Sequence, residues 1–207
     1  MSAIPLTPTQ SEPSRALVQP TASWTLPRRG PVGILFFILA ESSLFAVFVA
    51  AYLYYIGRSL TGPTPRQVLE FPVLMSVCLL SSSVTVHLAG RALAKGATAR
   101  FLRYWLATIF LGAAFLAGTA REWHELITVH HLTIRTNLFG STYYALVGLH
   151  ASHVIAGMVM LLIVAAFGLA GRIRPVHAER ADVISIYWHF VDVVWIVVVT
   201  VVYVIGR

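Results

Sequence analysis

Residues 139–170 read FGSTYYALVGLHASHVIAGMVMLLIVAAFGLA, and this stretch decides the fold class. Its 32 residues include no Asp, Glu, Lys or Arg. About 20 apolar residues suffice for an α-helix to cross a hydrocarbon core about 30 Å thick. The run is continuous and lacks the period-two alternation of a barrel strand. The stretch therefore predicts a membrane-spanning helix, which tilts or extends past the lipid headgroups because of its extra length.

Four further apolar runs predict four further spans, at residues 32–56, 71–93, 101–120 and 183–205. Residues 31–207 are thus expected to form an all-α integral membrane domain, a bundle of five transmembrane helices. No internal repeat is visible, which argues against a transporter built from duplicated halves.

The overall composition agrees with a membrane protein. Of the 207 residues, 57% are hydrophobic and 11% are charged, whereas a soluble domain has roughly a quarter of its residues charged. The formal net charge of +7 comes from basic residues that lie between the apolar runs, where they set membrane topology rather than bind nucleic acid. Cys78 is the one cysteine, so no intramolecular disulfide can form.

The first 30 residues differ from the rest of the chain. They contain five prolines among Thr, Ser and Gln, and no apolar run long enough to cross a membrane. We expect residues 1–30 to form a disordered or extended Pro-rich tail, because such a segment buries too little apolar surface to fold. A signal peptide is not expected, since no apolar stretch precedes a small-residue cleavage site.

The basic residues are divided unequally between the two sides of the predicted bundle. With five spans, the N-terminal tail shares a side with the second and fourth connections. Because Lys and Arg concentrate in cytoplasmic loops, we predict a cytoplasmic N-terminus and a C-terminus outside. The N-terminal side carries Arg15, Arg28, Arg29, Arg91, Lys95, Arg100, Arg103, Arg172, Arg174 and Arg180, and the other side carries Arg58, Arg66, Arg121, Arg135 and Arg207.

Glu41 is the first polar residue inside a predicted span, and it lies close to the membrane midplane. A charged carboxylate there costs about 2.5 kcal/mol or more. Glu41 is therefore either a protonated carboxyl that bonds to a neighbouring helix, which we favour, or a proton-active group.

Two histidines of the fourth run, His150 and His153, are three residues apart and are predicted to share a helix face. They could ligate haem or a metal, with His189 of the last run as a partner, but we favour hydrogen bonding between helices. Small residues beside them are candidate helix-packing positions, because they let another helix approach closely. These positions are Gly148, Ser152, Ala156 and Gly157.

The last run contains residues 187–195, YWHFVDVVW. His189 and Asp192 are three apart and can pair directly or reach different neighbours. We expect this group near the cytoplasmic end of its span, where Trp188 and Trp195 would anchor the helix at the interface.

The third run ends in a polar group, in which Glu122 is followed by His124 and Glu125. We favour a solvated helix end over a metal site, because no recognised ligand spacing is present. A Gly-rich phosphate loop, a GxSxG elbow and a CxxC motif are absent from the sequence, so no catalytic residue is assigned.

These motifs together resemble subunit III of the haem-copper respiratory oxidases. The run YWHFVDVVW is highly specific for that family, and the FGST segment with residues 148–157 is similar to a second family motif. Glu41 matches the family's SEMFF-type glutamate, and Glu122 stands where the family has a Glu-Tyr pair. Residues 80–85 resemble its LLSSGVT run. The resemblance covers residues 31–206, and the first two helices of the seven-helix family form have no counterpart.

The resemblance implies a function. Subunit III of a cytochrome c oxidase packs against subunits I and II in the bacterial plasma membrane, supports proton uptake and protects the active centre. Oxygen is reduced to water, and protons are pumped, in subunit I. The chain itself is then expected to hold no redox cofactor, since haems and copper belong to other subunits. Membrane phospholipid is a candidate ligand, and other respiratory complexes are candidate partners.

Three alternatives stay open at this point. The chain could belong to a quinol oxidase, or serve as an accessory subunit of nitric oxide reductase. A more distant alternative is a free-standing b-type cytochrome or small transporter that uses the histidines.

Overall fold

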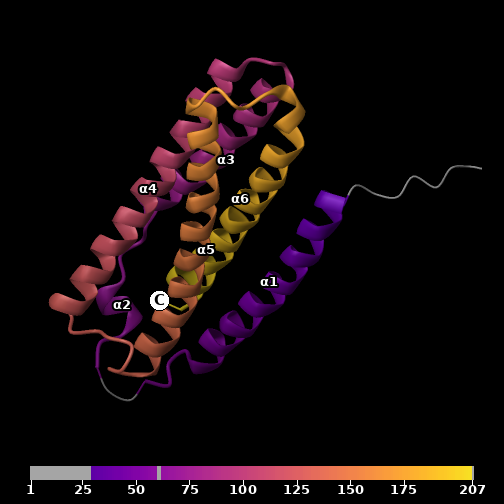
Figure 1. Cartoon of the computed structure of the whole chain (residues 1–207). Coiled ribbons are helices and arrows are strands. Elements are labelled where there is room, and N and C mark those ends of the chain that lie inside the picture. Colours follow the sequence, from indigo (N-terminus) through magenta and orange to yellow (C-terminus); the bar gives the residue numbers. More distant parts are fainter. Residues whose placement is uncertain (1–28, 60–61, 207) are drawn as a thin grey trace, which may run out of the picture.

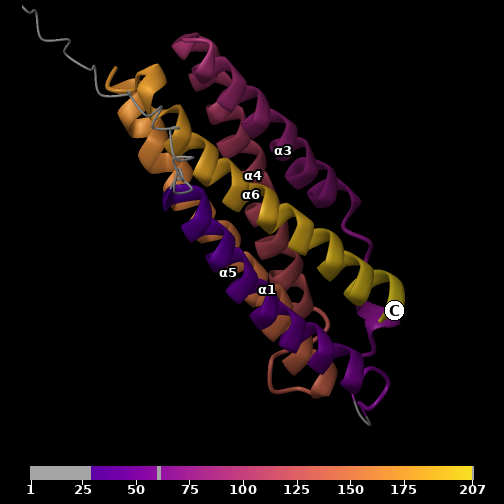
Figure 2. The same cartoon turned by 90° about the vertical axis from the view of Figure 1, so that its right-hand side faces the viewer.

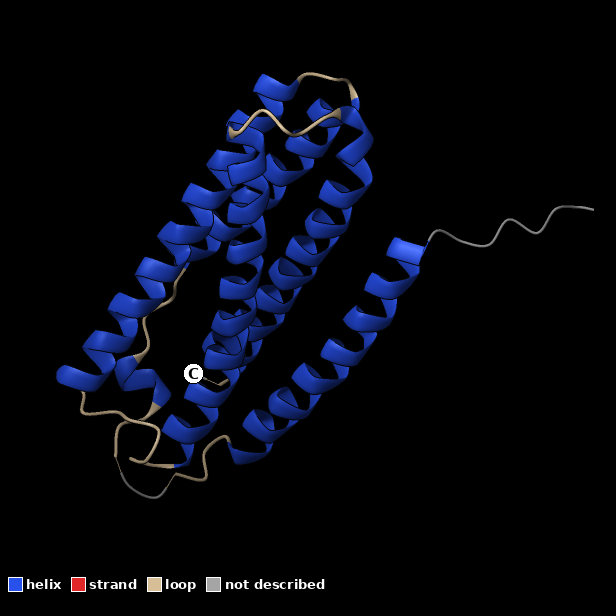
Figure 3. Cartoon of the chain, in the orientation of Figure 1, coloured by secondary structure: helices blue, strands red, loops and turns tan. Residues whose placement is uncertain are grey.

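The computed structural model describes residues 29–59 and 62–206, and the regular structure within these ranges is helical (Figure 3). Five helices there are long and apolar enough to cross a membrane, which confirms the predicted fold class. They are α1 (Arg29–Tyr55), α3 (Val73–Ala94), α4 (Thr98–Thr128), α5 (Leu138–Leu169) and α6 (Ala178–Val199). Three shorter elements are the helix α2 (Pro65–Val68), the 3-10 turn η1 (Pro175–His177) before α6, and the π-helical turn η2 (Thr200–Ile205) after it. The predicted Pro-rich tail lies outside the described residues, apart from its last two positions.

Two helices extend beyond the apolar runs that predicted them. The helix α4 continues past residue 120 to Thr128, because no Pro or Gly interrupts residues 121–128. The last span begins at Pro175 rather than at residue 183. In both places the apolar run ends where the side chains become polar. The helical hydrogen bonds of the backbone continue past that point.

The helices are arranged around α6. The helices α3 and α4 form a tight antiparallel pair, α4 also packs on α5, and α6 contacts α3 and α5. The helix α1 lies at the edge of the bundle, where it packs mainly on α5 and α6 (Figures 1 and 2). In the apolar, membrane-spanning part of α1 only 6% of the residues are buried by the rest of the protein. In the last span the corresponding share is 56%. The outer face of α1 is therefore available to lipid or to another subunit.

Trp188 is the central packing residue of the bundle and is fully buried. A methyl group on Gly112 of α4 would lie 2.9 Å from its ring, and one on Gly157 of α5 would lie 2.8 Å from it. Its indole N–H donates to the Ser82 hydroxyl of α3 at 2.8 Å. Trp188 thus joins three helices through a ring that fits only because two of them present glycine.

The expected position of the 187–195 group is wrong. Trp195 is also buried, against Phe115 of α4 at a ring-centroid distance of 4.8 Å. Because α6 begins at Ala178, His189 and Asp192 lie near the middle of the span and not at its cytoplasmic end. The two tryptophans therefore pack the core and do not anchor the helix at an interface.

Candidate functional site

Polar side chains from four helices gather at the same depth, halfway along the bundle. Glu41 lies near the middle of α1, His153 near the middle of α5, and Ser83 near the middle of α3. His189 and Asp192 lie near the middle of the last span. We call these five residues the mid-depth polar layer. A layer at this position is remote from both headgroup regions, so each of its members needs a protein partner.

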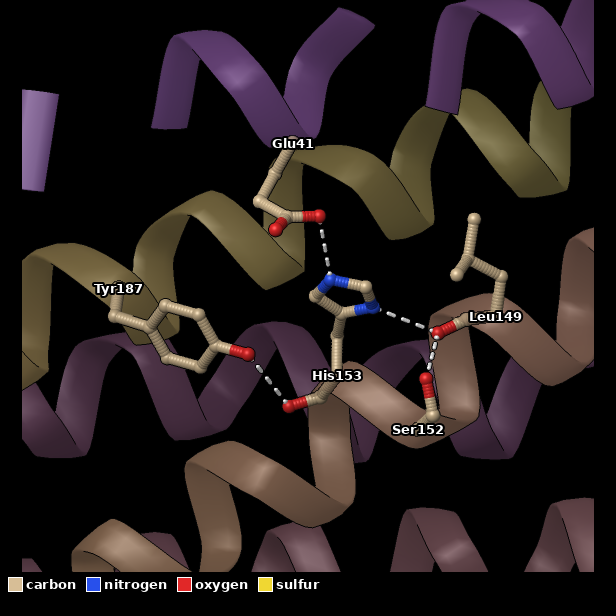
Figure 4. Close-up of polar contacts among 5 residues, drawn as sticks. All are labelled: Glu41, Leu149, Ser152, His153 and Tyr187. Carbon is tan, nitrogen blue, oxygen red and sulfur yellow. Dashed lines mark hydrogen bonds and ion pairs between the residues drawn. The ribbon is translucent and has the colours of Figure 1, made fainter. Parts of the chain in front are cut away.

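Glu41 and His153 connect α1 to α5. The Glu41 Oε2 atom lies 3.0 Å from His153 Nε2, and His153 Nδ1 lies 2.8 Å from the backbone carbonyl of Leu149 (Figure 4). The Tyr187 hydroxyl of α6 donates to the His153 carbonyl at 3.0 Å. The side chains of His153 and Glu41 are 13% and 21% exposed, so the pair is covered but reachable from the α1 edge.

The hydrogen bonds of His153 fix how many protons this pair holds. A backbone carbonyl only accepts, so His153 Nδ1 must carry a proton and donate it to Leu149. One further proton then lies between Nε2 and Oε2: a protonated Glu41 donates to a neutral imidazole, or an imidazolium donates to a carboxylate. Without that proton, the carboxylate would face the Nε2 lone pair. The pair therefore keeps zero net charge in either form, which suits its depth in the membrane.

His189 and Asp192 meet through a serine of α3 rather than by direct pairing. The Ser83 hydroxyl lies 2.8 Å from His189 Nδ1 and also bonds to Asp192 Oδ2. The three groups form a continuous hydrogen-bonded chain between α3 and α6. Asp192 is 3% exposed, and its Oδ1 atom has no hydrogen-bond partner within the described ranges.

His150 and His153 face different neighbours, although they are only three residues apart. The His150 ring is fully buried and stacks on Trp195 of α6 at a centroid distance of 5.0 Å. Its edge-to-face contact with Phe115 closes an aromatic box. Neither ring nitrogen of His150 meets a hydrogen-bond partner among the described residues. The favoured interpretation, hydrogen bonding between helices, thus describes His153 but not His150.

Glu122 belongs to a separate polar cluster near the end of α4. Its Oε1 atom accepts hydrogen bonds from Tyr143 of α5 at 3.1 Å and from Tyr203 of η2 at 2.7 Å. Both tyrosines are buried. Glu122 therefore joins three segments of the bundle, whereas the neighbouring His124 and Glu125 are exposed. In residues 29–59 and 62–206, no three His, Cys, Asp or Glu side chains gather as a metal site would require.

The candidate packing positions on α5 divide into two groups. Gly157 lies against the Trp188 ring, and Gly148 lies near Trp123, 3.5 Å from where a methyl group would be. Ser152 and Ala156 are exposed on the outer surface of α5. Ser152 and Ala156 thus face outward, and the close approach between helices occurs at Gly157, one position beyond Ala156.

Sequence reasoning missed the hydroxyl groups that complete these clusters. Ser82 and Ser83 lie in a run of three serines, which gave no signal of its own because serine is common in membrane helices. Tyr143 and Tyr203 are far apart in sequence, and only the fold brings them to Glu122. The sequence analysis favoured a solvated helix end at Glu122, so it did not predict these two donors.

Comparison with known proteins gives a match over most of the chain. Residues 25–207 match the sequence model of the family described as cytochrome c oxidase subunit III. Cytochrome c oxidase subunit 3 of Alkalihalophilus pseudofirmus is 34% identical over 177 residues, which cover 84% of this chain and 86% of the relative. The protein of the same name from Synechocystis is 35% identical over 179 residues, with 83% and 73% covered.

A relative with another name is similar to the same degree. Cytochrome bo(3) ubiquinol oxidase subunit 3 of Pseudomonas aeruginosa is 33% identical over 176 residues, and 84% of each chain is covered. Similarity of this kind therefore spans oxidases named for two different electron donors.

Proposed function

This chain belongs to the cytochrome c oxidase subunit III family, and we propose from that premise that it packs on the catalytic subunit I without carrying a redox centre. It is a multi-pass membrane protein and a subunit of a haem-copper oxidase complex. Within that complex we assign it to the contact with subunits I and II, in the plasma membrane of a bacterium. Its role there is to support proton uptake and the stability of the oxidase while oxygen is reduced to water.

The mid-depth Glu41–His153 pair carries this proposal. Its two ionisable side chains share a hydrogen bond at a depth where an isolated charge is costly. The pair lies at the junction of α1 and α5, where α1 leaves most of its own surface uncovered. The pair therefore offers an ionisable side chain to a neighbouring subunit, and its hydrogen bond fastens α1 to the bundle.

The contacts that the histidines make within the bundle support the proposal that this chain does not ligate haem. Both ring nitrogens of His153 have partners, and His189 Nδ1 lies against Ser83. The His150 ring is fully buried, and Phe115 and Trp195 pack against it, so a haem would have to displace packed side chains to reach it. Ligation at His153 would break one of its hydrogen bonds, and ligation at His150 would disrupt the aromatic packing around its ring. The haems and copper of the complex are accordingly assigned to the other subunits.

Copurification tests the proposal. A tagged chain purified from its own membranes in a mild detergent should carry a large haem-bearing subunit in a one-to-one ratio. After the subunits are separated, the haem absorbance should stay with that large subunit. Haem retained by the isolated chain, or a purified lone chain that moves a substrate unaided, would overturn the proposal.

A second candidate is subunit III of a quinol oxidase, which the similarity to the Pseudomonas aeruginosa protein favours. The same copurification separates the two candidates. A subunit II with a two-copper centre assigns cytochrome c as the electron donor, and a subunit II without that centre assigns quinol. A complex that reduced nitric oxide and not oxygen would instead identify an accessory subunit of nitric oxide reductase.

A further inference from the structure

A depression of about 580 Å³ lies on the flank of α6, at the end of the bundle where this helix begins. Val183 and Ile186 contribute apolar side chains to its wall, and Glu179 and Asp182 contribute two carboxylates. We call it the acidic depression. Ile186 also lines the groove between α1 and α6, together with Ile38 of α1. The acidic depression therefore continues that groove along α6, toward the start of the helix.

The two carboxylates lie at an end of the bundle that is otherwise basic. Among the described residues this end carries seven Lys and Arg, and its two acidic residues are Glu179 and Asp182. Within the described ranges Asp182 forms no ion pair. A basic segment near this end is repelled by most of the surface and attracted to the acidic depression. The charge pattern therefore favours a cationic occupant.

The chain itself brings a basic segment to this place. The helices α1 and α6 run in the same direction (Figure 1), and the rings of Phe37 and Tyr187 are in contact at 5.9 Å. Arg29 lies eight positions before Phe37, and Glu179 lies eight positions before Tyr187, which is about 12 Å along each helix. The helix α1 therefore begins close to the depth of the acidic depression, and the chain before residue 29 reaches the bundle beside it.

The five residues that precede α1 match the acidic depression in character. Residues 24–28 read WTLPR. Leu26 precedes a proline, and the residue before a proline favours an extended backbone. Alternate side chains of an extended segment point the same way, so Trp24, Leu26 and Arg28 share one side. That side offers two apolar groups and a cation to a surface that offers apolar groups and carboxylates.

We propose that residues 24–28 bind in the acidic depression. The Arg28 guanidinium pairs with the Asp182 carboxylate, and Leu26 packs on Val183. An anionic lipid headgroup is disfavoured there, because its phosphate would face two carboxylates. A basic segment of another subunit has the right charge, but residues 24–28 are tethered to α1, and a short tether gives an effective concentration on the order of millimolar.

This contact attaches the first turns of α1 to α6. Little of α1 is buried by the rest of the protein. Its polar attachment to α5, the Glu41–His153 pair, lies near the middle of the helix. Residues 24–28 add a second point of attachment at the start of α1, so the helix is held at two depths.

Disulfide cross-linking tests the inference in membranes that contain the whole complex, with copper phenanthroline as the oxidant. In a Cys78→Ser background, Leu26→Cys is combined either with Val183→Cys in the acidic depression or with Leu169→Cys at the exposed end of α5. Because a disulfide requires Cβ atoms about 3.5–4.5 Å apart, the first pair should cross-link at least about tenfold faster than the second. Equal rates would overturn the proposal.

Charge reversal tests the ion pair. Arg28→Glu should slow cross-linking of the first pair by about two- to fivefold, because an exposed ion pair is replaced by two like charges. The swap Arg28→Glu/Asp182→Arg should restore the rate. Arg15→Glu is the matched control, since it makes the same change of charge further along the same segment, and it should leave the rate unchanged. Equal slowing in Arg15→Glu, or no recovery in the swap, would contradict the pairing.

Accessibility of the acidic depression gives a second measurement that needs no cross-link. In permeabilised membranes, the thiol of Val183→Cys should react with a maleimide several-fold faster once residues 2–28 are deleted, whereas that of Leu169→Cys should react at the same rate. The variant Leu26→Ser/Arg28→Ser replaces the deletion if the shortened chain does not accumulate. Shielding of position 183 that persists in both would assign the depression to another subunit or to lipid, and would overturn the proposal.

Discussion

The carboxyl of Glu41 can be replaced by an amide without loss of its contact. In Glu41→Gln, the amide N–H donates to His153 Nε2, which accepts because Nδ1 keeps its proton for Leu149. We expect the oxidase to assemble normally and to show a modest change in proton-uptake rate or in the number of turnovers before inactivation. The measurement is stopped-flow proton uptake together with activity followed to exhaustion.

Two neighbouring variants make this test specific. Glu41→Ala leaves His153 Nε2 without a partner and should loosen α1 by about 1–3 kcal/mol, seen as less chain retained per haem after purification. Ser43→Ala is the control, since Ser43 bonds only to the Leu39 carbonyl of its own helix. If assembled Glu41→Gln oxidase reduced no oxygen at all, Glu41 would be a catalytic residue and the assigned role would be wrong.

Removal of the Ser83 hydroxyl affects two polar groups of α6 at once. Ser83→Ala breaks the bonds to His189 and Asp192 together and leaves a buried carboxyl unpaired. We expect a loss of about 1–2 kcal/mol in the free energy of unfolding, measured by denaturant titration in mixed micelles. Ser81→Ala, which changes an exposed serine on the same helix, should change it by less than about 0.5 kcal/mol.

A double-mutant cycle isolates the contact itself. Asp192→Ala combined with Ser83→Ala should give a coupling energy of about 0.6–1.7 kcal/mol, from the average to the maximum measured for hydrogen bonds between membrane helices. A coupling near zero would show that the two residues act independently and that the chain through Ser83 adds no stability.

The polar residues were predictable at this scale, but their partners were not. An ionisable side chain inside an apolar run is a strong signal because it is costly there, and Glu41, His153, His189 and Asp192 were found in this way. The sequence contains no comparable signal for Ser83 or Tyr203. Serine and tyrosine are inexpensive in a membrane helix, so their spacing is free to vary and only the packing of helices selects them.

At the scale of helices, Gly157 sets the distance between α5 and α6. A methyl group there would lie 2.8 Å from Trp188, whose ring is held on its other side by Gly112 and by its bond to Ser82. At Gly148 a methyl group would meet Trp123 at 3.5 Å, an ordinary contact. Both substitutions to alanine gain the same helix propensity, so the difference between them reports packing alone.

We expect Gly157→Ala to be less stable than Gly148→Ala by about 1–3 kcal/mol. Thermal unfolding in detergent, followed by tryptophan fluorescence, measures the difference. Equal stability of the two variants would mean that Trp188 moves aside and that the ring does not fix the helix spacing.

Helix boundaries were predicted well where the chain turns sharply and poorly where it does not. The ends of α3 and α5 fell within a residue of the apolar runs, because Gly96 and Gly171 end these helices at the same place as the hydropathy. The end of α4 lies eight residues beyond the predicted end. Its last two turns carry polar side chains on the outer face, while Glu122 bonds to Tyr143 on the inner face. Hydropathy cannot distinguish such a segment from a loop. The same limitation misplaced residues 187–195, whose helix starts among polar residues.

At the scale of the whole molecule, the two ends of the bundle differ in charge. The end formed by the α3–α4 and α5–α6 connections carries seven of the eleven basic residues between positions 58 and 206. Basic residues next to a span are retained in the cytoplasm. The fold gathers these basic residues at one end of the bundle, and we predict that this end faces the cytoplasm.

Labelling of single cysteines decides the orientation. In a Cys78→Ser background, Val176→Cys places a thiol in η1 at the basic end, and Val129→Cys places one after α4 at the other end; both parent side chains are exposed. In intact spheroplasts a membrane-impermeant maleimide should label position 129 and leave position 176 unlabelled, because the bilayer separates the reagent from the cytoplasmic end. After detergent permeabilisation both should react, which controls for burial in the complex. The reverse pattern would place the basic end outside and would contradict the predicted orientation.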